Sequence, residues 1–194
     1  MSTFMLVVLG FIAFVILVCL LIVFWIIATY NGFVESRTLV EEAWSGVDVQ
    51  LKRRANLIPN LVATVKGYAE HESSTFAEVT EARAGIGGKN LAERAETEGR
   101  LQKSLMSLFA VAEAYPQLQA DENFRSLQNE ISGLEDVIQK ARRYYNGTVR
   151  DFNTKLQVFP ANLVGSFFKF AQAEFYEVEN QEDTVVPRVD FSDQ

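Results

Sequence analysis

Residues 4–28 read FMLVVLGFIAFVILVCLLIVFWIIA, an apolar run without a charged residue, in which Gly10 is the one weak helix former. About 20 apolar residues in a helix cross the ~30 Å hydrocarbon core of a bilayer, so this run can cross it with some tilt. A secretory signal needs a basic start and an apolar run of only about 7–15 residues. The sequence therefore predicts a short N-terminal tail at 1–3 and a retained transmembrane helix at 4–29, with the bilayer as a partner.

The flanking charges predict the orientation of this span. No lysine or arginine precedes the run, whereas Arg37 follows it closely. Positively charged residues near a span favour its cytoplasmic side. We therefore expect the N-terminus outside and the rest of the chain in the cytoplasm.

Composition excludes several classes of function. The 194 residues carry 18 Lys and Arg against 25 Asp and Glu, for a net charge of −7. From Glu174 onward, Arg188 is the one base among seven acids, so 177–194 is predicted to be an acidic flexible tail. Because nucleic-acid binding needs a basic stripe, which the sequence lacks, no nucleic-acid partner is expected.

The residues that carry chemistry are sparse. Cys19 is the single cysteine and His71 the single histidine, which excludes an internal disulfide and a thiolate zinc site. Glu70, His71 and Glu72 suggest a metal-binding helix, but an HExxH motif needs a second histidine where this chain has Thr75. We therefore predict no enzyme, no catalytic residue, no metal site and no cofactor.

The rest of the chain is predicted to be helical. Apolar residues recur every seven positions in two rows, as in a bundle or coiled coil, which predicts a first helix from Tyr30 to Ala84. A glycine-rich turn at 85–90 follows, then a second helix from Leu91, capped by Asn90, to Tyr115. A third helix begins at an Asp121 cap and ends before Pro160. The two rows contain Phe33, Val40, Val47, Leu61, Trp44, Leu51, Ile58 and Val65.

The predicted fold class is all-α, with a transmembrane helix followed by an elongated antiparallel bundle over 30–160. An aromatic segment at 161–176 could add a short helix, either on the bundle or on a lipid surface. At 1.5 Å per residue, the first helix would rise about 80 Å and the second would return only about 37 Å. The third helix would then run away from the membrane again, so the membrane-proximal part of the first helix would have no packing partner in its own chain.

An uncovered apolar seam should find a partner. One alternative is a homo-oligomer that buries the seam between copies of the chain. The other is a break at Pro59, since proline removes a helix hydrogen bond, which would give four helices instead of three. The predicted self-association seam consists of Phe33, Val40, Trp44, Val47 and Leu51.

Three consecutive basic residues precede Pro59. Lys52 and Arg53 are candidates for contact with an anion or a lipid headgroup, because their positions share part of one helix face. Arg54 falls on the apolar stripe instead, which predicts a structural ion pair with an acid from another helix.

Two long stretches resemble the LemA family of bacterial membrane proteins. They are residues 42–84, with VDVQLKRR, LIPNLV and VKGYAEHE, and residues 115–163, with ARRYYN and FNTKL. The resemblance covers roughly residues 30–170. It implies a single-pass protein of the bacterial cytoplasmic (inner) membrane with a helical bundle, and it implies no catalytic residues. Some relatives are associated with magnetosome membranes and others lie near membrane proteases.

Two functions fit these features. The first is a membrane-anchored scaffold that self-associates and organises membrane or membrane-protein assemblies. The second is an adaptor that presents partners to a membrane protease or another membrane complex.

Overall fold

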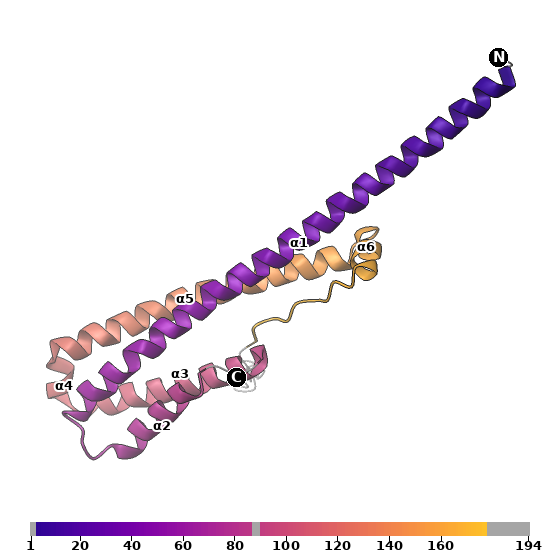
Figure 1. Ribbon diagram of the computed structural model, residues 1–194. Coiled ribbons are helices and arrows are strands. Elements are labelled where there is room, and N and C mark those ends of the chain that lie inside the picture. Colours follow the sequence, from indigo (N-terminus) through magenta and orange to yellow (C-terminus); the bar gives the residue numbers. More distant parts are fainter. Residues whose placement is uncertain (1–2, 87–89, 178–194) are drawn as a thin grey trace, which may run out of the picture. The chain divides into compact units, whose positions relative to one another are not determined.

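The computed structural model describes residues 3–86 and 90–177 (Figure 1). Within these ranges the chain is helical and has no strand, which confirms the predicted all-α fold. The described residues form two compact units: unit 1 holds residues 3–46 and Arg143–Phe175, and unit 2 holds residues 47–86, 90–142 and 176–177. The helices are α1 (Thr3–Lys66), α2 (Ser73–Ala84), α3 (Leu91–Glu113), α4 (Pro116–Ala120), α5 (Glu122–Gln157) and α6 (Ala161–Phe167).

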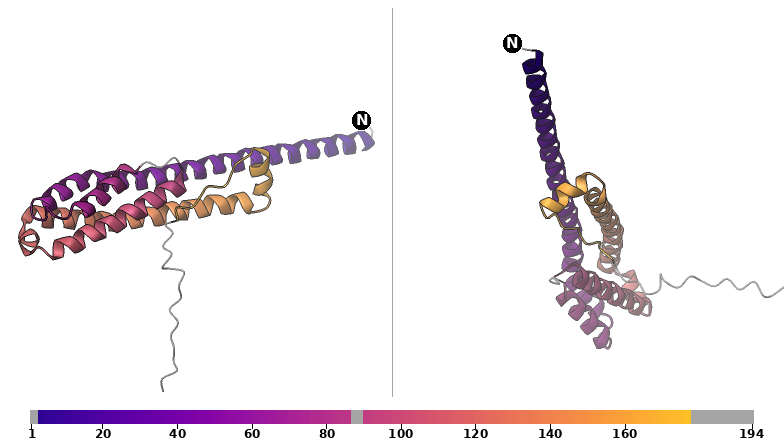
Figure 2. Two further views of the ribbon diagram at one scale, coloured as in Figure 1. Left: turned by 90° about the horizontal axis from the view of Figure 1, so that it is seen from below. Right: turned by 90° about the vertical axis from the view of Figure 1, so that its right-hand side faces the viewer.

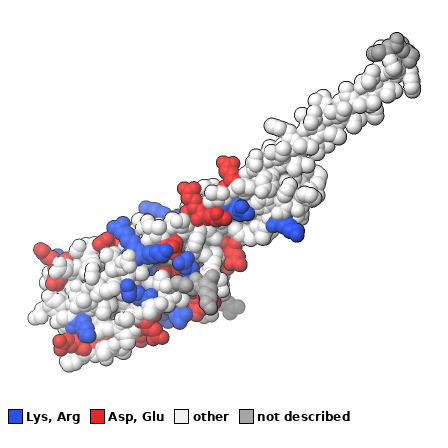
Figure 3. Space-filling model, in the orientation of Figure 1, with Lys and Arg blue, Asp and Glu red and all other residues white. Residues whose placement is uncertain are grey.

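The first half of α1 is the apolar run. Its most apolar window has a mean hydropathy of 3.5 and none of it is buried within the protein. In the space-filling view no charged side chain appears along it (Figure 3). One helix long and apolar enough to span a membrane once is therefore present in the described residues.

Unit 1 packs the middle of α1 against the end of α5. Lys155 Nζ donates a hydrogen bond to Ser36 Oγ at 2.6 Å, and the rings of Trp44 and Tyr145 have centroids 5.5 Å apart. Numbers rise along α1 as they fall along α5, so the two segments are antiparallel.

Helix α6 lies beside α1 in both views of Figure 2. Phe33 of α1 is buried, and its ring centroid lies 5.2 Å from that of Phe170, just after α6. A Cβ atom at Gly165 would come within 2.9 Å of Leu156 and 3.5 Å of Phe33. A larger residue at this position would therefore require the end of the Leu156 side chain to shift, whereas its contact with Phe33 would be an ordinary one.

An extended segment at 170–175 runs back along α5. The Asn153 side chain donates to the Ala173 carbonyl and accepts from the Ala173 amide, both at 2.9 Å. Tyr145 donates its hydroxyl to the Glu174 carbonyl at 2.8 Å. These bonds satisfy backbone groups that have no helix of their own.

Unit 2 is a helical bundle with an apolar core. Its helices are the second part of α1, then α2, α3, α4 and the first part of α5. The core contains Ile58, Leu61, Val65, Ala69, Phe76, Val79, Leu101, Leu105, Leu108, Ala112, Leu118, Phe124 and Ile131.

The first bundle helix ends earlier than predicted. It stops at Lys66 rather than Ala84, and the chain reverses over 67–72 before α2 begins. Gly67, a poor helix former, follows the last helical residue. Tyr68 donates its hydroxyl to Asp121 at 3.1 Å, which ties this turn to the start of α5.

This reversal changes the direction of every later helix. In unit 2, Arg83 of α2 reaches back to Ala55, so α2 returns along α1. Helix α3 then runs parallel to α1, and α5 returns, with Arg53 of α1 bonded to Glu130. The sequence analysis expected the third long helix to run away from the membrane-proximal part of α1. In the structure it runs back toward that part.

The premise of the self-association seam is consequently wrong. Its apolar side chains are covered by their own chain: Trp44 is half-buried and contacts Tyr145. The other four seam residues, Phe33, Val40, Val47 and Leu51, are buried.

Pro59 does not break α1, which continues through it. Proline lacks the N–H that would bond the carbonyl four residues earlier, here that of Ala55. Arg83 Nε of α2 donates to this Ala55 carbonyl at 2.9 Å. The neighbouring helix therefore replaces the hydrogen bond that the proline removes.

Both predicted helix caps are confirmed. Asn90 Oδ1 accepts from the Glu93 amide at 2.8 Å, and Asp121 Oδ1 accepts from the Phe124 amide at 2.9 Å. A part of the predicted turn, 87–89, lies outside the described residues, as does the predicted acidic tail from 178 onward.

Candidate functional site

Charged side chains gather in the interior of unit 2, where apolar residues would be expected. Arg54 is 0% exposed and Glu98 2%, while Glu135 keeps about a quarter of its side chain exposed. Two arginines and two glutamates balance in charge. We define the buried cluster as Arg54, Glu98, Glu135, Arg142 and Tyr176.

The Arg54 guanidinium bridges three helices. From α1 it donates through Nη2 to Glu98 of α3 and through Nη1 to Glu135 of α5. This confirms the predicted ion pair of Arg54 with another helix. Since an unpaired charge is costly in a bundle core, the pairing fixes how α1, α3 and α5 align along one another.

Arg142 connects α5 to the C-terminal part of the described chain. Its guanidinium carbon lies 4.8 Å from the centroid of the Tyr176 ring, a cation–π contact. Its Nη2 also donates to the Tyr176 hydroxyl at 3.4 Å. Tyr176 is thereby held in the bundle, although no helix extends to it.

Burial dominates the electrostatics of the cluster. It raises the pKa of Glu98 above its ordinary value, and the positive charges of Arg54 and Arg142 offset only part of this effect. Burial likewise raises the pKa of Tyr176. Glu98 is almost sealed from solvent, so the arrangement serves to hold helices together and offers little surface to a substrate.

The sequence analysis did not single out Glu98. A signal was available for Glu98, which lies seven residues before Leu105 and so falls on the apolar stripe of its helix. Arg142 follows Ile138 by four residues on the stripe of α5. An acid and a base on facing apolar stripes predict a buried pair.

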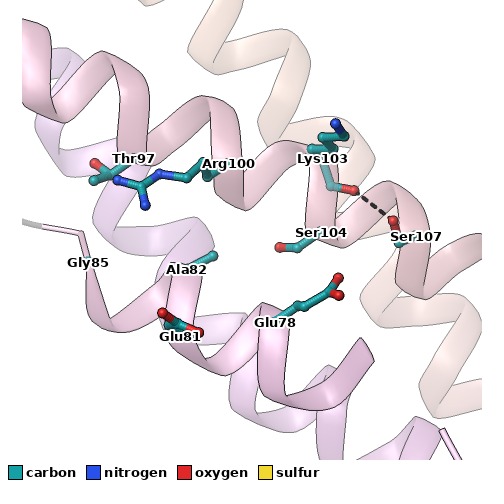
Figure 4. A pocket seen from close by; sticks show the side chains of 9 residues that line it. All are labelled: Glu78, Glu81, Ala82, Gly85, Thr97, Arg100, Lys103, Ser104 and Ser107. Carbon is teal, nitrogen blue, oxygen red and sulfur yellow. Dashed lines mark hydrogen bonds between the residues drawn. The ribbon is translucent and has the colours of Figure 1, made fainter. Parts of the chain in front are cut away.

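A hollow of about 570 Å³ lies between α2 and α3 (Figure 4). Glu78 and Glu81 come from α2, and Arg100 and Lys103 stand opposite on α3. The Ser107 hydroxyl donates to the Lys103 carbonyl at 3.3 Å, so it is bonded to its own helix. The described residues that line the hollow put acidic side chains on its α2 wall and basic side chains on its α3 wall.

A second hollow, also of about 570 Å³, lies between α3 and α5. Four apolar side chains contribute to its lining, and one of them, Met106, is two-thirds exposed. The apolar lining side chains are Leu105, Met106, Phe109 and Ile131.

Lys52 and Arg53, the candidates for anion or lipid contact, each have an acidic partner. Lys52 Nζ lies 2.7 Å from Asp48 Oδ2, and Arg53 Nη2 lies 3.0 Å from Glu130 Oε1. Burial alone would raise the pKa of Asp48, but the bonds and charges of Lys52 and Arg94 hold it below its ordinary value. Both basic side chains remain largely exposed, so their binding of an external anion stays a prediction.

His71 lies exposed in the turn before α2. Among the described residues, no three His, Cys, Asp or Glu side chains lie close enough together to hold a metal ion.

Comparison with known proteins identifies the family. The model of the LemA family matches residues 43–191, a range that contains the whole buried cluster. The chain belongs to the LemA family. Its match to the family covers the bundle and leaves out the apolar run.

Curated relatives include both LemA and magnetosome proteins. Protein LemA of Metamycoplasma hominis is 25% identical over 93% of this LemA-family chain and 81% of its own length. Magnetosome protein MamQ 2 of Paramagnetospirillum magneticum is 26% identical over 81% of this chain and 68% of its own. Magnetosome protein MamQ of Magnetospirillum gryphiswaldense is 23% identical over the same shares.

Proposed function

We propose that this chain is a membrane-anchored helical scaffold that self-associates and organises assemblies of membrane proteins. The observation that carries the proposal is the uninterrupted course of α1. Within unit 1 the helix passes from an apolar run into packed contacts at Phe33 and Ser36 without a linker. A tethered enzyme needs only a flexible tether, whereas a scaffold benefits from an anchor that is part of the folded unit.

The relatives support this proposal. Three of the proteins to which the chain is similar are named magnetosome proteins, and we propose that this chain likewise serves an organised assembly. Arg54, Glu98 and Glu135 of the buried cluster form ion pairs, and the walls of the hollow between α2 and α3 carry opposite charges. They therefore support binding and structure better than chemistry.

We place the protein in the bacterial cytoplasmic (inner) membrane, with the bundle in the cytoplasm. Arg37 follows the apolar run by nine residues and is exposed, as the positive-inside rule requires. Fusion of a fluorescent protein that folds only in the cytoplasm to the C-terminus tests the orientation. A dark fusion together with an active periplasmic reporter at the same end contradicts it.

Self-association can be tested with the native cysteine. Cys19 is the single cysteine, and its side chain is exposed on the apolar run. In native membranes a mild oxidant should crosslink the chain through Cys19, and Cys19→Ser should abolish the product. Light scattering in mild detergent should give a multiple of the 21.9 kDa chain mass. The mass of a single chain together with no crosslink would rule out a self-associating scaffold.

The second candidate function is an adaptor for a membrane complex, and the hollow between α3 and α5 favours it. The exposed Met106 and its apolar neighbours offer a flexible contact surface of the kind that accepts varied partner helices. Met106→Glu should then reduce co-purification of a crosslinked membrane partner without changing the mass of the protein itself. An unchanged partner yield would argue against binding at this hollow.

A further inference from the structure

An exposed apolar surface lies at the end of α5 and on α6, within unit 1. Phe159 is 75% exposed, Leu163 61% and Phe167 79%. Burying such side chains against water-excluding surroundings is favourable by about 1.5–3 kcal/mol each, so their exposure needs an explanation. We call this surface the aromatic shelf and define it as Val158, Phe159, Leu163, Phe167 and Phe168.

Ring contacts place the aromatic shelf next to the end of the apolar run. The ring centroid of Phe168 lies 4.8 Å from that of Tyr30, and the centroid of Phe170 lies 5.6 Å from it. Tyr30 follows Ala28, the last residue of the run, by two positions, which is about 3 Å along a helix. The aromatic shelf therefore lies at the level where the transmembrane helix leaves the hydrocarbon core.

The charges around the aromatic shelf suit a lipid headgroup region. Residues 158–173 contain no acid, and Lys169 is their one charged residue. The Arg37 guanidinium carbon lies 5.7 Å from the centroid of the Phe170 ring. Aromatic rings flanked by cations are typical of membrane interfaces, where rings enter the headgroups and cations meet phosphates.

The length of the apolar run fits a lateral contact with the membrane. Its 25 residues span about 37 Å as a helix, more than the ~30 Å hydrocarbon core. A span that is too long tilts, and residues at the interface help to set its direction. A tilt toward α6 would bring the aromatic shelf closer to the lipid.

We propose that the aromatic shelf is a second membrane-contacting element, inserted among the lipid headgroups of the leaflet where α1 leaves the membrane. This inference rests on the proposed membrane anchoring. It adds to that anchoring a folded, non-spanning segment that binds the bilayer from the side. The occupant of the surface is therefore lipid, continuous with the lipid around the span.

Lipid-quenching measurements on the full chain test the proposal. In a Cys19→Ser background, single cysteines are introduced by Phe167→Cys, Leu163→Cys, Met106→Cys and Ile16→Cys and labelled with an environment-sensitive fluorophore. The protein is reconstituted in vesicles of phosphatidylethanolamine and phosphatidylglycerol that contain nitroxide-labelled phospholipid. Met106 is the matched control, because it is similarly exposed but lies in unit 2.

We expect blue-shifted emission and quenching by nitroxides near the headgroup for labels at 167 and 163. The label at 106 should keep water-like emission and respond to aqueous iodide instead. Water-like emission at 167 and 163 would overturn the proposal, and so would protection from both quenchers, which would indicate contact with a second protein chain. The label at 16 reports on the anchor separately: if nitroxides deep in the bilayer do not quench it, the proposed anchoring itself fails.

Discussion

Removing one cation from the buried cluster should destabilise unit 2 strongly. Arg54→Met leaves Glu98, 2% exposed, without its main partner and changes a balanced set of two arginines and two glutamates to a net negative one. Breaking a buried ion pair from one side costs about 3–5 kcal/mol. Urea unfolding of the full chain in lipid nanodiscs, followed by far-ultraviolet circular dichroism, measures the loss.

A double substitution provides the control. Arg54→Met with Glu98→Met removes one charge of each sign, so Arg142 and Glu135 still balance. Since hydrophobic replacement of a whole buried pair is often neutral or stabilising, the double variant should be more stable than Arg54→Met alone. If Arg54→Met costs less than about 1 kcal/mol, or if the double variant is no more stable, the charge-balance reasoning is refuted.

Three further predictions concern single contacts. Folding raises the pKa of Glu98, so the contribution of this group to the free energy of unfolding is present at low pH and falls as the pH rises through the folded pKa. Urea unfolding across this pH range should show that Glu98→Gln loses this pH dependence. A pH profile parallel to that of the wild type would contradict the prediction. Arg83→Met should lower the free energy of unfolding by about 1–3 kcal/mol in the wild type. The same substitution should cost little in a Pro59→Ala background, because alanine restores the missing N–H. Equal losses in both backgrounds would show that Arg83 does not replace the hydrogen bond of the proline. Asn153→Ala should speed hydrogen exchange at the Ala173 amide, whereas unchanged exchange would show that other contacts hold the segment.

Much of the fold could be predicted from local patterns. The apolar run and the seven-residue spacing predict helices because both signals depend only on neighbouring residues. The caps at Asn90 and Asp121 were predictable for the same reason, since each bonds an amide three residues ahead. The ion pairing of Arg54 followed from a charge on an apolar stripe.

Two features were beyond local patterns. The apolar spacing continues through Val65, Phe76 and Val79 on both sides of the turn at 67–72, so the pattern could not show that the chain reverses there. The continuity of α1 at Pro59 depends on Arg83, which is distant in sequence. The predicted directions of the helices after this turn were therefore wrong. As a result, the predicted seam was given no packing partner within its own chain.

The partners of the buried cluster were only partly predictable. The position of Arg54 predicts a buried ion pair. Its partners, Glu98 and Glu135, depend on which helices pack together and in which register. Tyr176 had no periodic signal, because the segment before it is extended and held by the side chains of α5. Sequence patterns show which residues are unusual more readily than they show where those residues meet.

The ring contacts at Tyr30 also determine the rotational setting of the span. A helix advances about 100° per residue, so Cys19 lies about 20° around the axis from Tyr30, and so does Arg37. Because Phe168 and Phe170 engage this side of α1, the face that bears Cys19 points in the direction of α6. The contacts of unit 1 therefore preset the azimuth of the span within the bilayer, including the direction in which Cys19 points.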